Sequence, residues 1–181
     1  MLKKNKIIKI MPLFIIITTS AITYNILYTY SLNEYNFTSP IYNIEDKYIK
    51  NISTETDIKI FNDYFDLENC KIKVVDKDNK ELQKGYVYTG SITQIYNNEN
   101  ELITTYTNIV KGDITKDGLS NLKDIETISS IILNNKNLED YEKLSIDMNN
   151  DNEIKANDIA LLKSYQSKQY ESLKLNKSNV H

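Results

Sequence analysis

Two stretches in the C-terminal part of this 181-residue chain carry oxygen-bearing side chains at the spacing of a calcium-binding loop. Counted from the first aspartate of each stretch, these side chains stand at positions 1, 3, 5 and 12 of a twelve-residue loop. They are Asp113, Thr115, Asp117 and Asp124 in loop one, and Asp147, Asn149, Asp151 and Asp158 in loop two, 34 residues later. Ca²⁺ prefers about six to eight oxygen ligands, and alternate residues of a tight loop can point inward to supply them.

The sixth position of each loop is the place where the chain must turn sharply. Gly118 and Asn152 stand there, and both residue types adopt a positive φ more readily than others. One Asp-rich loop is often only a solvated turn, but two copies in register, each opening an amphipathic helix, favour metal binding. A period of 34 residues is also typical of tetratricopeptide repeats. The polar loop that begins each copy argues against that architecture.

The segment before loop one distinguishes these loops from ordinary EF-hands, in which a helix precedes the loop and Glu occupies position 12. Residues 106–112 are rich in β-branched side chains and end in glycine, so we expect an extended segment there. A duplicated loop that is followed but not preceded by a helix, with Asp at both ends, resembles the dockerin family. The lead-in at 110–113 and the inter-repeat segment 138–145 also fit. The resemblance covers roughly residues 112–166.

This resemblance implies a secreted, non-catalytic module that binds two Ca²⁺ ions and docks noncovalently onto a cohesin domain. Carried over by position, the ligands of loop one are Asp113, Thr115, Asp117, the Leu119 carbonyl, Asn121 and Asp124. The ligands of loop two are Asp147, Asn149, Asp151, the Glu153 carbonyl and Asp158. Three positions depart from the family pattern: Thr115 replaces Asn or Asp, Ser120 replaces an apolar residue at position 8, and Lys155 occupies position 9.

Dockerins meet cohesins largely through loop positions 10 and 11 and the helix that follows. The resemblance therefore implies partner contacts at Leu122 and Lys123 in repeat one, and at Ala156 and Asn157 in repeat two. Because the two pairs differ, a symmetric, reversible docking mode is disfavoured. Plain solvated helix surface is the alternative interpretation of these four residues, and the sequence leaves open which repeat faces the partner.

The N-terminus has the pattern of a targeting segment. Four lysines within the first nine residues precede an apolar run at 10–18, which corresponds to the n-region and h-region of a signal peptide. Small residues at 19–21 suit cleavage, but the apolar character continues to Leu27, long enough for a membrane helix. A cleaved signal and a retained anchor both stay open for residues 1–30, with a slight preference for an anchor. Either predicts an extracytoplasmic location.

The middle of the chain predicts a linker at 31–46 and a small β-rich domain at 47–110. Within this domain we expect strands at 48–52 and 71–75, a hairpin of 92–96 with 102–110, and a short helix at 55–65 opened by a capping box at Thr54. In residues 48–56, in Val87-Tyr-Thr-Gly90 and in the extended run into 110–112, the domain resembles, more weakly, small β-rich domains that precede dockerins in surface proteins of Gram-positive bacteria. In that setting it would brace the dockerin or hold it at a distance, and we expect the two units to pack together.

Apolar residues from Leu122 to Ile132 recur at helical spacing, and a second stripe follows loop two. The two stripes should pack on each other, capped by a helix near 138–144, in a dockerin-like domain at 111–168. Residues 169–181 read as a disordered tail. The predicted fold class is α+β: an N-terminal membrane helix or signal, a small β-rich domain, and an all-α dockerin-like pair of loop–helix motifs.

Composition excludes several function classes. The net charge of −3 lacks the basic footprint of a nucleic-acid-binding protein. His181 is the sole histidine and Cys70 the sole cysteine, so no nucleophile–base pair of these residues is available and we predict that the chain is not an enzyme. We expect a monomeric docking module on the cell surface. The alternatives are a calcium-stabilised surface protein without a cohesin partner, or an accessory part of a polysaccharide-degrading system.

Overall fold

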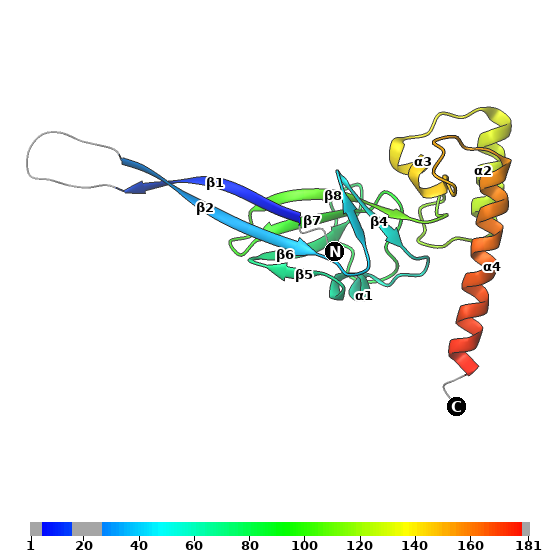
Figure 1. Ribbon diagram of the computed structural model, residues 1–181, viewed down its shortest axis with the longest axis horizontal. Helices are drawn as coiled ribbons and strands as arrows, with labels where there is room; N and C mark the ends of the chain where they lie inside the picture. Colours follow the sequence, from blue (N-terminus) through cyan, green and yellow to red (C-terminus); the bar gives the residue numbers. More distant parts are fainter. Residues whose placement is uncertain (1–4, 16–26, 179–181) are drawn as a thin grey trace, which may run out of the picture.

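The computed structural model describes residues 5–15 and 27–178, which form strands and helices in two groups (Figure 1). The strands are β1 (Asn5–Ile15), β2 (Leu27–Thr38), β3 (Asn43–Glu45), β4 (Tyr48–Ile52), β5 (Asp66–Glu68), β6 (Cys70–Val75), β7 (Ile92–Asn97) and β8 (Leu102–Val110). The helices are α1 (Ile58–Asp63), α2 (Leu122–Asn134), α3 (Asp140–Ile146) and α4 (Ala156–Ser178). The three C-terminal helices lie at one end of the molecule and the β1–β2 hairpin projects from the other (Figure 1).

A five-stranded sheet with the order β3-β4-β8-β7-β6 forms the centre of the molecule. The strands predicted at 48–52 and 71–75 are confirmed, and β7 and β8 form the predicted antiparallel hairpin. Runs of Ile, Val, Thr and Tyr favour these strands because β-branched and aromatic side chains fit a pleated surface. The turn of the hairpin ends at Asn100, which adopts a positive φ of 66°. Strand β8 pairs in parallel with β4 and leads directly into loop one.

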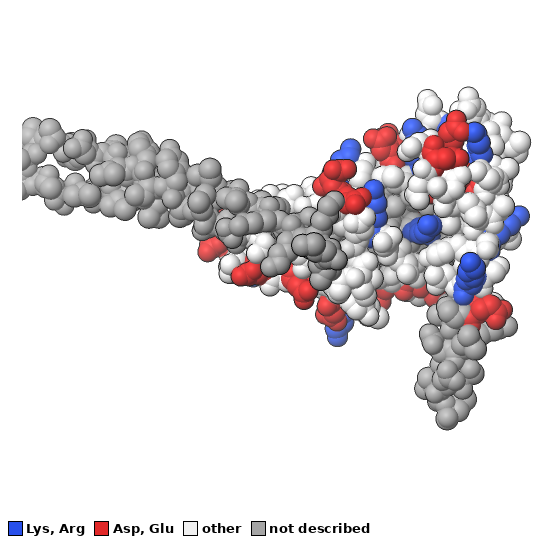
Figure 2. All heavy atoms as spheres, in the orientation of Figure 1, with Lys and Arg blue, Asp and Glu red and all other residues white. Residues whose placement is uncertain are grey.

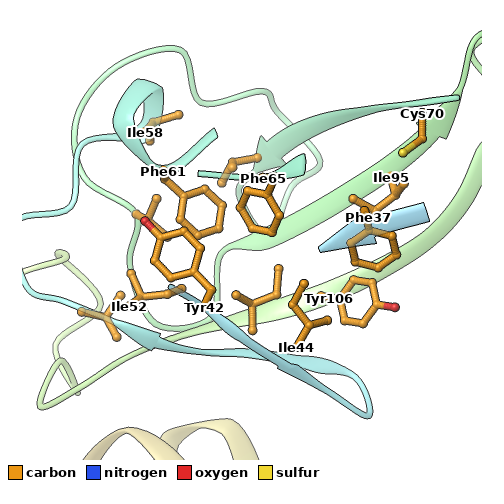
Figure 3. Close-up of a cluster of buried hydrophobic side chains, with 14 of the residues drawn as sticks. Phe37, Tyr42, Ile44, Ile52, Ile58, Phe61, Phe65, Cys70, Ile95 and Tyr106 are labelled. Carbon is orange, nitrogen blue, oxygen red and sulfur yellow. The ribbon is translucent and has the colours of Figure 1, made fainter. Parts of the chain in front are cut away.

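The first hydrophobic core lies on this sheet and is rich in aromatic rings (Figure 3). Phe37 and Phe61 are fully buried, and the Phe37 ring meets that of Tyr106 with centroids 5.3 Å apart. The structure differs here from the linker predicted at 31–46, since Tyr35, Phe37 and Tyr42 all contribute to the core. Aromatic side chains of this size stabilise a fold strongly when they leave water, and β2 also pairs with β5.

Helix α1 begins later than the sequence predicts. Its N-cap is Asp57, whose Oδ1 accepts a hydrogen bond from the Lys59 amide at 2.8 Å. The capping box predicted at Thr54 is therefore wrong, because Asp57 satisfies the first turn. Thr54 contacts loop one of the C-terminal part, as described below.

The C-terminal helices enclose a second, smaller hydrophobic core. Ile128, Ile146 and Leu162 are fully buried in it, one from each of the three helices. The predicted stripe on α2 is confirmed at Ile125, Ile128 and Ile131, whereas Leu122 is exposed. Helix α4 continues to Ser178, past the boundary at 168 where we expected a tail to begin.

The predicted fold class is wrong in two respects. First, residues 5–15 and 27–38, which include part of the expected membrane helix, form paired antiparallel strands. Isoleucine-rich runs are ambiguous between strand and helix from hydropathy alone, and β-branched residues favour the strand. In the described part of the chain, no helix combines the length and the apolar character needed to span a bilayer. The cleavage site expected at residues 19–21 lies outside the described residues.

Second, the C-terminal part is not a separate all-α unit. The structure is mixed, with two sheets and four helices in the described residues, and the helical part is joined to the sheet. The Gly112 amide donates a hydrogen bond to the Ser145 carbonyl at 2.7 Å, which fixes the end of the β8 lead-in against α3. A side chain at Gly112 has no room, because a Cβ would lie 2.5 Å from Leu162 Cδ1.

Candidate calcium-binding loops

The first aspartate of loop one is buried and holds the loop closed. Asp113 Oδ1 accepts a hydrogen bond from the Asp117 amide at 3.1 Å, and Oδ2 accepts one from the Gly118 amide at 3.1 Å. A third donor comes from the β-rich part, since the Thr89 amide lies 2.8 Å from Oδ2. One carboxylate at position 1 therefore binds the backbone amides of positions 5 and 6 of the loop.

Loop two repeats this frame at the same positions. Asp147 Oδ1 accepts from the Asp151 amide at 3.2 Å, and Oδ2 accepts from the Asn152 amide at 2.9 Å. The predicted sharp turn at position 6 is confirmed, because φ is +77° at Gly118 and +64° at Asn152. The repeat seen in the sequence is thus also a repeat of hydrogen bonds and backbone conformation.

The aspartate at position 12 closes the other end of each loop. Asp124 accepts from the amides of Ile114 and Asn121, at 3.0 and 2.9 Å. Asp158 accepts from the equivalent amides of Met148 and Lys155, both at 2.9 Å. Both carboxylates are fully buried. Each lies in the first turn of its helix, α2 or α4, where a negative charge is favourable.

The residues at positions 3 and 5 lie nearer the surface. The Thr115 hydroxyl donates to Asp124 Oδ1 at 2.9 Å, and the Asn149 side-chain amide donates to Asp151 Oδ2 at 2.8 Å. At position 5, Asp117 and Asp151 each accept from the amide two residues ahead, that of Leu119 or Glu153. The structure therefore brings positions 3 and 12 together in loop one, and positions 3 and 5 together in loop two.

The two loops differ at position 9. Asn121 caps α2, and its Oδ1 accepts from the Lys123 amide at 2.9 Å. Lys155 forms an ion pair with Glu153 at the exposed edge of loop two. The Asn121 oxygen is thus engaged with the backbone of its own helix, and loop two offers no side-chain oxygen at this position.

The two loops together bury four carboxylates, those of Asp113, Asp124, Asp147 and Asp158. Burial raises the pKa of Asp113 to about 6, although the amides of Thr89, Asp117 and Gly118 oppose the shift. Burying a charge without a partner is costly, so a cation among these oxygens would be stabilised. The donors are all oxygen, as a hard cation such as Ca²⁺ prefers.

The side chains themselves are hydrogen-bonded to the loop backbone. Among residues 5–15 and 27–178, no three His, Cys, Asp or Glu side chains lie close enough together to be grouped as a metal site. An ionised carboxylate has about four lone-pair sites. Asp147 and Asp158 accept two hydrogen bonds each and Asp113 accepts three, which leaves capacity for a cation, whereas Asp124 already accepts four. The loop frame fits the ion, while the ligand set assigned by position stays a prediction.

The four residues predicted to contact a partner lie at the helix starts. Leu122 and Lys123 are exposed in the first turn of α2, and Ala156 and Asn157 are exposed in the first turn of α4. Leu122 keeps 65% of its surface exposed, which is unusual for leucine. The structure thus leaves both pairs available, and no partner is present to choose between them.

Sequence reasoning missed the β-rich residues that contact loop one. These are Thr54, Glu55, Val87 and Thr89, which lie far from the loop along the chain. No local pattern indicates that they contact the loop, because the sequence around Thr54 predicts a helix cap and that around Thr89 predicts a bend. Only the requirement that β8 runs straight into loop one pointed to packing between the two parts.

Comparison with known families finds a similarity for the C-terminal segment. Residues 111–165 match the family model described as the dockerin type I domain. Over these residues the chain is similar to type I dockerin domains. The predicted resemblance is confirmed for this part of the chain, which is less than a third of its length. No curated protein and no solved structure gives a match. The dockerin assignment indicates a non-catalytic, calcium-binding docking module.

Proposed function

We propose that this chain is a docking protein whose dockerin domain binds two Ca²⁺ ions and attaches noncovalently to a cohesin-type domain outside the cytoplasm. The observation that carries the proposal is the shared frame of the two loops. Asp113 and Asp147 each accept the amides four and five residues ahead, and Asp124 and Asp158 each accept the amides of positions 2 and 9. Such a duplicated, oxygen-lined loop suits paired calcium sites.

The residues that would hold the ions follow from this frame. Oxygens at positions 1, 3, 5 and 12 belong to Asp113, Thr115, Asp117 and Asp124 in loop one, and to Asp147, Asn149, Asp151 and Asp158 in loop two. The carbonyls of Leu119 and Glu153 would supply position 7. Bound Ca²⁺ would neutralise the buried carboxylates and stabilise the loops against opening.

The surface for the partner lies on the outer face of α2 and at the start of α4. Leu122 and Leu133, 65% and 84% exposed, stand about three turns apart on one side of α2, next to Lys123. The start of α4 offers Ala156, Asn157 and the half-exposed Leu161. Figure 2 shows acidic and basic side chains interspersed on the described part of one face. Exposed leucines beside polar groups suit a protein partner.

The location outside the cytoplasm is supported by the chemistry of the loops. Extracellular calcium modules work with dissociation constants of roughly 10⁻⁴–10⁻³ M, which only calcium-rich surroundings saturate. Thr115 and Lys155 each remove a carboxylate or amide oxygen from the usual pattern, so weak sites of this kind are expected here. We also propose that the β-rich part is not an enzyme.

Calorimetric titration of the calcium-free chain, followed by capture on immobilised cohesin domains, tests the function. We expect two ions per chain and capture that requires calcium. Asp113→Ala combined with Asp147→Ala should abolish both, whereas Asp76→Ala, in a turn of the β-rich part, should leave both intact. Calcium uptake without capture by any cohesin of the source organism would favour the alternative, a calcium-stabilised structural protein. Absence of calcium uptake would refute the proposal.

A further inference from the structure

The two dockerin loops are held by different parts of the molecule. Loop one is hydrogen-bonded to the β-rich part at its start and at its middle, whereas among residues 5–15 and 27–178 no such hydrogen bond reaches loop two. Gly118 at position 6 of loop one is buried, and its counterpart Asn152 in loop two is exposed. The two loops share the hydrogen bonds of positions 1 and 12, but their surroundings differ.

Residues 54 and 55, in the segment between β4 and α1, bind the middle of loop one. The Thr54 hydroxyl accepts a hydrogen bond from the Ser120 amide at 2.8 Å and lies 3.4 Å from the Gly118 carbonyl. The Glu55 amide donates to the same carbonyl at 2.9 Å. Positions 6 and 8 of the loop are thus fixed by two neighbouring residues that are more than sixty positions away in the sequence.

The segment 86–89 binds the start and the turn of the same loop. The Thr89 amide donates to Asp113 Oδ2, the position 1 carboxylate, at 2.8 Å, and Thr89 is itself fully buried. The Thr89 hydroxyl is fixed in turn by Val110 at the end of β8, at 3.1 Å. Tyr86 and Val87 press so closely on Gly118 that a Cβ there would lie 2.6 Å from Tyr86 Cβ.

Loop two packs against the smaller hydrophobic core through Met148 and Ile154. In the described part of the chain, the hydrogen bonds of Asp147 to Asp158 connect residues 143–158 with each other. A cleft of about 650 Å³ separates this loop from the β-rich part. It is lined on one side by Asp46, Lys47 and Tyr48, and on the other by α3, Asp147 and Asn152.

We propose that Thr54 and Thr89 are positioning residues for the first calcium site, so that calcium binding at loop one and folding of the β-rich part stabilise each other, while loop two binds independently. This inference rests on the proposed calcium binding. A residue that stabilises the calcium-binding conformation of a loop raises the affinity of that loop for calcium. By linkage, bound calcium stabilises the segment that holds the residue by the same free energy. Thr54 does so through Ser120, and Thr89 does so through the Asp113 carboxylate.

A calcium chloride titration of the full chain, followed by NMR, tests the coupling. The amides of Gly118 and Asn152 donate to the two position 1 carboxylates, so each reports on its own loop. Thr54→Val keeps the shape of the side chain but leaves the Ser120 amide without its acceptor. We expect calcium binding at loop one to weaken about five- to tenfold, the effect of one lost hydrogen bond, with loop two unchanged. Thr56→Val is the matched control, since its hydroxyl bonds only to Ser53 nearby, and it should change neither loop.

Amide hydrogen exchange supplies a second measurement that needs no change at Thr54. Saturating calcium should slow exchange of the Glu55 amide about tenfold or more, because this amide bonds to Gly118. Asp113→Asn should remove that protection and Asp147→Asn should preserve it. The coupling would be refuted if Thr54→Val weakened calcium binding equally at both loops, or if both aspartate variants lost protection of the Glu55 amide equally. Either result would leave the proposed calcium binding intact. If neither Gly118 nor Asn152 responds to calcium in the unaltered protein, the proposed function itself fails.

Discussion

Replacing Gly118 by alanine should destabilise the protein far more than the same change at the equivalent position of loop two. Gly118 has a φ of +77°, and Asn152 has a φ of +64°. Alanine in the left-handed region costs about 1–2 kcal/mol relative to the right-handed one. At Gly118 the new Cβ would also lie 2.6 Å from Tyr86 Cβ and 2.7 Å from the Val87 carbonyl oxygen. Overpacking of this kind adds about 1–3 kcal/mol.

The two contributions together give about 2–5 kcal/mol for Gly118→Ala. Asn152 is exposed, and asparagine already bears part of the backbone cost, so we expect less than about 1 kcal/mol for Asn152→Ala. For a chain of this length each kcal/mol lowers Tm by about 2–4 °C. The melting temperature should therefore fall by roughly 4–20 °C in the first variant and by at most about 4 °C in the second.

Thermal unfolding followed by far-UV circular dichroism, in excess calcium and again in excess chelator, measures this difference. The clash involves Tyr86 Cβ and the Val87 carbonyl oxygen, which are not calcium ligands. The difference in Tm between the two variants should therefore persist without calcium. Equal shifts in the two variants would refute the close packing of loop one on Tyr86 and Val87. A gap that vanishes in chelator would show that Gly118 acts through the ion and not through the interface.

Two further predictions concern other contacts. The ion pair of Lys116 with Glu142, 2.7 Å apart, joins loop one to α3. Burial alone would raise the pKa of Glu142, but the Lys116 ammonium and the Glu139 amide hold it below its ordinary value of 4.5. The ion pair is partly exposed and contributes less than about 1 kcal/mol to the free energy of unfolding. This contribution is present above pH 4.5 and is lost as pH falls through the lower pKa of Glu142 in the folded state. In urea unfolding, the difference in free energy of unfolding between the unaltered protein and Glu142→Gln should shrink below pH 4.5. A difference that does not change with pH would contradict a stabilising ion pair. Phe37→Ala, at a fully buried ring, should cost about 3–5 kcal/mol in the same assay, whereas a change near zero would restore the predicted linker.

The two loops and their sharp turns could be predicted from the sequence because their spacing is local. Asp113 and Asp124 lie within one twelve-residue loop, and the turn between them depends on the φ preference of Gly118. The apolar stripe of α2 and the β7–β8 hairpin are local in the same sense, since side-chain period reports which face is buried. Their bounds agree with the structure to within about one or two residues.

Other features were outside the reach of local patterns. Residues 5–15 and 27–38 read as a membrane segment and a linker by composition, yet their pairing into β1 and β2 depends on partner strands. Thr54 reads as a helix cap because its neighbours resemble a capping box, but Asp57 takes that role. A hydroxyl can satisfy several alternative partners, and the fold selects among them.

The sequence by itself thus determined that two loops of oxygen side chains exist, that each opens a helix, and that residues 111–165 resemble a dockerin. Only the tertiary structure decided that these two similar loops have unlike surroundings. Hydrogen bonds such as Thr89 to Asp113 and Thr54 to Ser120 join residues 24 and 66 positions apart, and they form only after β8 has placed loop one against the β-rich part. Local spacing fixes which oxygens a loop contains, whereas chain topology fixes what lies beside it.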